Sequence, residues 1–167
     1  MDQVVSELLQ RTRDIVERHT EQSAKHAADF NVFEILGRTD DEVKCHSAFI
    51  ACLLDPQGSH GQKSLFLKPF LDRLRNGISP DDQSVDWITR EGTWRVGTEV
   101  AFDKGKHRID ILLEAEESII AIENKIYADD QDGQMRRYKE KIDQSGKRNR
   151  ALVYLTLDRR KPSDRSL

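Results

Sequence analysis

The chain has 167 residues and a formal net charge of −3, and 34% of its residues are charged. This length fits one domain with its own core, and the acidic balance excludes a uniformly basic nucleic-acid-binding protein but not a local basic patch. No apolar run approaches the ~20 residues of a membrane span, and the N-terminus lacks the pattern of a secretory signal. The two cysteines, Cys45 and Cys52, are too few for a disulfide framework or a four-ligand zinc site, so we expect a cytoplasmic protein.

The N-terminal half of the chain has the apolar spacing of helices. Capping patterns, glycines and prolines suggest where these helices begin and end. Together these features predict a long helix over 2–28, a short helical turn over 31–37, a helix from the Thr39–Glu42 capping box to the residue before Pro56, and a helix over 64–75 that Asn76 and Gly77 stop.

The C-terminal half alternates between apolar and polar residues, as strands do. We expect strands over 94–102, 108–114, 119–125 and 151–157, a helix over 129–144 and a frayed polar tail over 158–167. Short turns allow the first three strands to pair antiparallel, and the helical crossover favours a parallel fourth strand. The predicted fold is therefore α/β: a mixed central sheet of about four strands flanked by helices, in the order α-β-β-β-α-β. We expect one domain, with 1–30 as a helical extension, 31–157 as the core and 158–167 as the tail.

The sharpest chemical signal lies in the second and third predicted strands. If residues 115–118 form a regular hairpin connection, paired residue numbers sum to 233, which places Asp110 opposite Glu123. Lys125 shares that face of the sheet. Two opposed carboxylates repel each other, and a divalent cation with hard oxygen ligands, Mg²⁺ or Mn²⁺, would remove the repulsion. The alternative is an ordinary salt bridge between Lys125 and one carboxylate on a solvated face.

Asp110, followed after twelve residues by Glu123-Asn124-Lys125, resembles the signature of the PD-(D/E)XK nuclease superfamily. The segments 31–36, 46–50 and 53–56 resemble one bacterial, mostly uncharacterised group within it, and the resemblance spans 31–162. It implies a restriction-endonuclease-like core, with Asp110 and Glu123 as metal ligands, the Asn124 carbonyl as a further ligand and Lys125 as a catalytic lysine. Ile109 stands where the motif has proline, which varies in many members. Relatives in this group are often longer, which leaves a truncated product or the loss of a DNA-positioning domain open.

Two pairs of residues could support such a site. Members of the superfamily often add an acidic residue from the helix before the sheet, and Glu42 is the candidate, with His46 one helical turn later. The alternatives are that Glu42 only completes the capping box and that His46 is an ordinary half-buried histidine. Gln134 and Tyr138 form a Gln-x-x-x-Tyr pattern that resembles one found beside the active site of RecB-like nucleases. The alternative is that Tyr138 only packs in the core while Gln134 is solvated.

Basic residues near the start of the second predicted strand and in the predicted helix over 129–144 could contact phosphates without reading base sequence. The candidates are Lys106, Arg108, Arg136 and Arg137, although a charge run is also common on a solvated face. The leading hypothesis is a Mg²⁺- or Mn²⁺-dependent nuclease that acts on DNA in preference to RNA, without a membrane partner and with a homodimer or larger assembly left open. The alternatives are a catalytically silent nuclease fold that binds DNA or protein, and a plain structural domain in which the Asp110–Glu123–Lys125 face is covered.

Overall fold

The computed structural model describes residues 2–26, 31–78, 87–88 and 93–167. Its contacts divide the chain into two compact units, residues 1–39 and residues 40–167. Among the described residues, no helix has the length and apolar character to cross a membrane.

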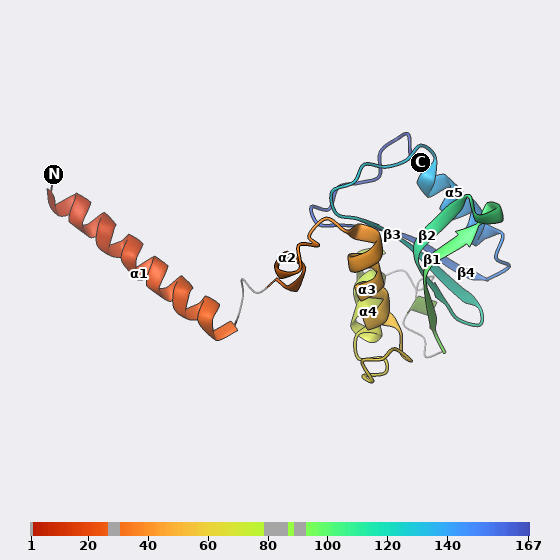
Figure 1. Cartoon of the computed structure of the whole chain (residues 1–167), viewed down its shortest axis with the longest axis horizontal. Coiled ribbons are helices and arrows are strands. Elements are labelled where there is room, and N and C mark those ends of the chain that lie inside the picture. Colours follow the sequence, from red (N-terminus) through yellow and green to blue (C-terminus); the bar gives the residue numbers. More distant parts are fainter. Residues whose placement is uncertain (1, 27–30, 79–86, 89–92) are drawn as a thin grey trace. The chain divides into compact units, whose positions relative to one another are not determined.

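The described residues of the first unit form helices α1 and α2 (Figure 1). Helix α1 spans Asp2–His26, close to the predicted range, and its apolar side chains are exposed. Helix α2 spans Val32–Ile35 and is capped by the Asn31 side chain, which accepts hydrogen bonds from the N–H groups of Phe33 and Glu34. The predicted stop at Gly37 agrees with its positive φ of 62°.

The second unit begins with a π-helix, Glu42–Ser47, which continues into α3, Ala48–Leu54. The predicted capping box is wrong in its first residue, because the cap is Asp41, whose carboxylate accepts from the Lys44 N–H at 2.9 Å. Helix α4 spans Leu67–Ile78, so it begins later than predicted and continues through Gly77. Pro69 lies in its first turn, where the missing N–H has no intrahelical partner to lose.

The four-stranded mixed sheet is confirmed, with the order β1-β2-β3-β4. Strand β1 spans Arg95–Phe102, a 3-10 turn spans Asp103–Gly105, and β2, β3 and β4 span His107–Glu114, Ser118–Lys125 and Asn149–Thr156. The β2–β3 ladder has the predicted register, with Glu114 opposite Ile119 and Ile111 opposite Ile122. The crossover connection makes β4 parallel to β3.

Helices cover both faces of the sheet, with α3 and α4 on one face and α5, Gln134–Asp143, on the other (Figure 1). One apolar cluster joins Leu54 and Leu71 to β2 and β3, and a second joins Tyr138 and Ile142 to the opposite face. Every residue of β3 is buried, because this strand is interior to the sheet and covered on both faces.

Two expectations for the C-terminal part are wrong. Helix α5 begins five residues later than predicted, because Gly133 adopts a left-handed conformation with φ of 63° and breaks the chain direction. Asp129, Asp130 and Asp132, which fall in the first turn of the predicted helix, therefore precede α5. The tail is not frayed, since Ser166 is fully buried and its backbone and side chain both bond to the first turn of α5.

Candidate active site

Glu123 and Lys125 lie at the carboxyl end of β3 and form a buried ion pair. The Lys125 Nζ is 2.8 Å from the Glu123 Oε1, and the two side chains are only 8% and 1% exposed. The alternative of a salt bridge on a solvated face is therefore wrong about the solvated face, although the ion pair itself exists. Removing two charges from water costs free energy that their attraction only partly returns. Such a pair directly after the apolar run Ile119–Ile122 indicates a role other than stability.

Asp110 lies on β2 beside this pair and is half-buried. Its Oδ2 accepts the backbone N–H of Asn124 at 2.8 Å, so the residue between Glu123 and Lys125 holds the second carboxylate in place. Burial, and then the negative charge of Glu123, raise the pKa of Asp110 to about 7, although the Asn124 N–H and Lys125 act in the opposite direction. The repulsion between two carboxylates predicted from the hairpin register is thus present in the folded protein.

One oxygen of Glu123 has no hydrogen-bond partner in the described part of the chain. The Oε2 atom is buried, and none of the described residues donates a hydrogen bond to it. A buried carboxylate oxygen without a donor is costly, and a cation would satisfy it. Among the described residues, no three His, Cys, Asp or Glu side chains converge as a complete metal site. Mg²⁺ does not require such a set, because it is usually held by one or two carboxylates together with water and substrate phosphates.

Gln134 and Tyr138 both reach this site from α5. The Gln134 Nε2 donates to the Glu123 Oε1 at 2.8 Å, and its side chain is buried, so the alternative of a solvated Gln134 is wrong. The Tyr138 hydroxyl donates to the Arg108 carbonyl, and its ring packs against Phe102. Burial and the nearby charges of Glu123 and Asp110 raise the pKa of Tyr138 far above its ordinary value, so it remains a donor.

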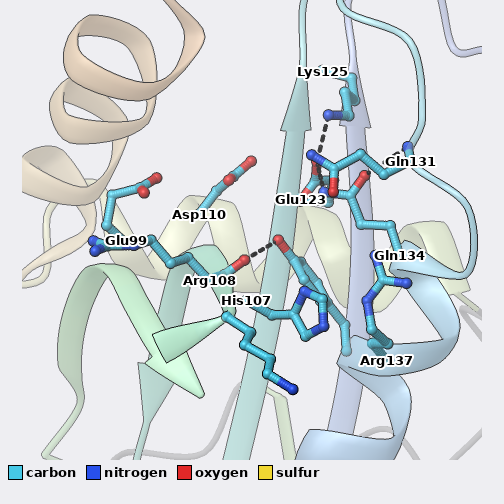
Figure 2. Close-up of a pocket in the computed structure, with 11 residues that line it drawn as sticks. Glu99, His107, Arg108, Asp110, Glu123, Lys125, Gln131, Gln134 and Arg137 are labelled. Atoms are coloured by element: carbon cyan, nitrogen blue, oxygen red, sulfur yellow. Dashed lines mark hydrogen bonds and ion pairs between the residues drawn. The ribbon is translucent and has the colours of Figure 1, made fainter. Parts of the chain in front are cut away.

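These side chains line a pocket of about 280 Å³ (Figure 2). Glu99 and Asp110 lie on one side of it, and Glu123, Lys125 and Gln134 lie on the other. The pocket is also lined by Lys106, His107, Arg108, Gln131, Arg137 and Tyr138. Of the predicted phosphate-contacting residues, three therefore lie at the pocket. Arg136 is not among the described residues that line it, although it neighbours Arg137 on α5.

The helical candidates are less well placed. The side chain of Glu42 lies outside the described part of the structure, so its role as a ligand stays a prediction. The residues from Glu42 to Ser47 form a π-helix, in which the His46 N–H donates to the Asp41 carbonyl at 3.1 Å. The α-helical spacing that placed Glu42 and His46 on one face therefore does not hold. His46 is not among the described residues that line the pocket.

Asn124 links this helical segment to the site. Its side-chain Nδ2 donates to the hydroxyl of Ser47 at 3.1 Å, and both side chains are buried. The π-helix thus fixes the residue whose N–H holds Asp110. The prediction that the Asn124 carbonyl binds metal stays a prediction.

Three residues that line the pocket, Glu99, His107 and Gln131, are not among the predicted site residues, and Glu99 is the acidic one. It lies on β1 with a positive φ of 51°, between the paired residues Thr98 and Val100, and its negative charge contributes to the raised pKa of Asp110. The β1–β2 register places it opposite Asp110, since Thr98 pairs with Ile111 and Val100 with Ile109. The counting that placed Asp110 opposite Glu123 across the β2–β3 turn would also have placed Glu99 opposite Asp110 across the β1–β2 turn.

Comparisons with known proteins agree with this geometry. A family model described as the PD-(D/E)XK nuclease superfamily matches residues 30–167, which include the sheet, α5 and every candidate residue named above. Searches among curated proteins and among solved structures found no match. Because the family match covers most of the chain, this protein belongs to the PD-(D/E)XK nuclease superfamily.

Proposed function

We propose that this protein is a metal-dependent nuclease that hydrolyses phosphodiester bonds, of DNA in preference to RNA. The observation that carries the proposal is the buried Glu123 Oε2, to which no residue in the described part of the chain donates and which lies in one pocket with Asp110 and Lys125. Nucleases of this superfamily generally use divalent metals. The donor set fits a hard cation such as Mg²⁺ or Mn²⁺, with Asp110 and Glu123 as the protein ligands and the Asn124 carbonyl and Glu42 as further candidates. When bound, the cation would activate water and stabilise the charge that develops on the phosphate.

The residues of the chain itself have distinct tasks in this proposal. Asp110 and Glu123 present carboxylate oxygens to the pocket from its two sides. Lys125 has three N–H donors, so its ammonium group can hold Glu123 while it orients the attacking water or a phosphate oxygen. Gln134 fixes the Glu123 carboxylate by donating to Oε1, which leaves Oε2 as the oxygen directed to a ligand.

The basic residues at the pocket would position the nucleic-acid backbone. Lys106, Arg108 and Arg137 line the pocket, and Arg136 lies next to Arg137 on α5. Contacts of this kind are made to phosphates, which DNA and RNA share. The preference for DNA therefore rests on the resemblance to restriction-endonuclease-like proteins and requires a direct comparison of substrates.

The experiment is cleavage of supercoiled plasmid, single-stranded DNA and RNA with Mg²⁺ or Mn²⁺, and with EDTA as the metal-free arm. We expect nicking by the wild type and at least a hundredfold loss in Asp110→Asn and Glu123→Gln. Glu114→Gln, which changes an exposed carboxylate at the far end of β2, is the matched control. Undiminished cleavage by both site variants would place the activity elsewhere.

The second candidate is a catalytically silent nuclease fold that binds DNA or a protein. It is favoured by the absence, among the described residues, of three converging metal-ligating side chains. Isothermal titration with MgCl₂ separates the two candidates. A wild type that binds neither Mg²⁺ nor Mn²⁺ and cleaves none of the three substrates would support the silent fold.

A further inference from the structure

The C-terminal segment, residues 163–167, packs onto the start of α5. The Arg165 carbonyl accepts the Gly133 N–H at 2.6 Å, and the Ser166 carbonyl accepts the Arg136 N–H at 3.2 Å. The Ser166 hydroxyl oxygen accepts the Met135 N–H at 3.3 Å, and Ser166 is fully buried. These contacts connect parts of the chain that are about thirty residues apart and no sequence pattern indicated them.

Ser166 does for α5 what an N-cap side chain does for most helices. The first N–H groups of a helix have no intrahelical acceptor, and a Ser, Thr, Asp or Asn at the N-cap normally accepts one of them. The N-cap of α5 is Gly133, which has no side chain to do this. The hydroxyl and carbonyl oxygens of Ser166 accept the N–H groups of Met135 and Arg136. Ser166 thus stabilises the first turn of α5 although it lies outside the helix.

Asp130 anchors the loop that leads into this turn. Its Oδ1 accepts the Tyr154 hydroxyl at 2.5 Å and its Oδ2 accepts the Ser163 N–H at 2.6 Å. Its backbone carbonyl accepts the Arg165 guanidinium at 2.8 Å. Tyr154 pairs with Glu123 across the β3–β4 ladder. One carboxylate thus ties the loop to the C-terminal segment and to the strand beside the candidate active site.

Gln134 connects this loop and the first turn of α5 to the candidate active site. It is the first residue of α5, its Oε1 accepts the Gln131 N–H at 3.3 Å, and its Nε2 donates to Glu123 at 2.8 Å. We propose that Asp130 and Ser166 are positioning residues, which hold the loop and the first turn of α5 so that Gln134 orients the Glu123 carboxylate. This inference rests on the proposed function for its catalytic consequence, but the hydrogen bond that it concerns exists without metal or substrate.

The test compares Asp130→Ala with Asp130→Asn in ¹⁵N-labelled, metal-free protein by NMR. We expect Asp130→Ala to shift the Gln134 side-chain amide signals toward those of solvent-exposed glutamines and to speed their exchange with water. Asp130→Asn should retain the wild-type signals, because its amide can accept from the Ser163 N–H and donate to the Tyr154 hydroxyl. Asp129→Ala removes a carboxylate from an exposed neighbour in the same loop and is the matched control.

Tyr154→Phe is a milder second variant, which removes a single hydroxyl and should shift the same signals by less. Unchanged Gln134 signals in Asp130→Ala and Tyr154→Phe would overturn the inference, and so would an equal shift in Asp129→Ala. In the cleavage assay, the Mg²⁺ concentration for half-maximal rate should rise about tenfold in Asp130→Ala, as for other outer residues of metal sites. If the wild type cleaves nothing, the proposed function fails while the NMR comparison still decides this inference.

Discussion

Replacing Asp110 with Asn should stabilise the protein, and the gain should depend on pH. The native state raises the pKa of Asp110 from 3.8 to about 7, chiefly through burial and the Glu123 charge. Between these two pH values the native state holds a proton that the unfolded state has released. The free energy of unfolding of the wild type therefore falls as pH rises from about 4 through about 7. In Asp110→Asn the side chain does not titrate, so this decrease is absent.

The size of the effect follows from the shift. One pKa unit corresponds to about 1.4 kcal/mol, so the shift to about 7 sets an upper limit of about 4 kcal/mol at pH 8. At pH 5 most of this penalty is still absent, so the gain from Asp110→Asn should grow by up to about 3 kcal/mol between pH 5 and pH 8. The asparagine Oδ1 can still accept the Asn124 N–H, so the variant should lose little packing or hydrogen bonding.

Urea unfolding at pH 5 and pH 8, with and without MgCl₂, measures this. At pH 8 Mg²⁺ should stabilise the wild type, because binding relieves the carboxylate repulsion, and should have little effect on Asp110→Asn. Glu114→Gln, at the exposed end of the same strand, controls for the loss of a carboxylate as such. A variant that is less stable than the wild type at pH 8, or a gain that is the same at both pH values, would refute the reasoning.

Three further changes have expected outcomes. Lys125→Met should abolish plasmid nicking and lower the free energy of unfolding by about 3–5 kcal/mol, because it leaves Glu123 as an uncompensated buried charge; the double variant with Glu123→Gln should recover most of that stability in the same melts. Arg137→Ala should weaken DNA binding uniformly across sequences and reduce the slope of log affinity against log salt by about 1, as measured by fluorescence anisotropy. Gly133→Ala should cost about 1 kcal/mol in urea unfolding, because φ of 63° is unfavourable for alanine, whereas the flexible end of Arg136 that the new methyl group meets can move aside.

The parts of the site that sequence predicted correctly depend on local geometry. Residues 115–118 fix the register of β2 against β3, so the proximity of Asp110 and Glu123 follows from counting along a hairpin. The two-residue period of a strand then places Lys125 with Glu123. The same counting was available for Glu99 at the first turn, and it was missed because Glu99 belongs to no motif.

The parts that sequence did not predict depend on contacts between distant segments. The capping box and the α-helical period predicted an ordinary α-helix. The segment that Asp41 caps is instead a π-helix, and its last residue, Ser47, accepts a hydrogen bond from Asn124, 77 residues away. The late start of α5 has a similar cause. Gly133 ends the preceding loop, and the missing cap is supplied by Ser166 from a tail whose polar composition suggested only disorder.

The charges on β3 argue for function because they work against stability. All eight residues of this strand are buried, and the apolar run Ile119–Ile122 within it needs no charge for the fold. Glu123 and Lys125 at its end are tolerated because they pair with each other and because Gln134 donates to Glu123, yet none of the described residues donates to the second Glu123 oxygen. Apolar residues of similar volume in place of a buried ion pair are often neutral or stabilising. The fold therefore maintains these buried charges at a cost in stability. A ligand bound to the Glu123 Oε2 would account for them.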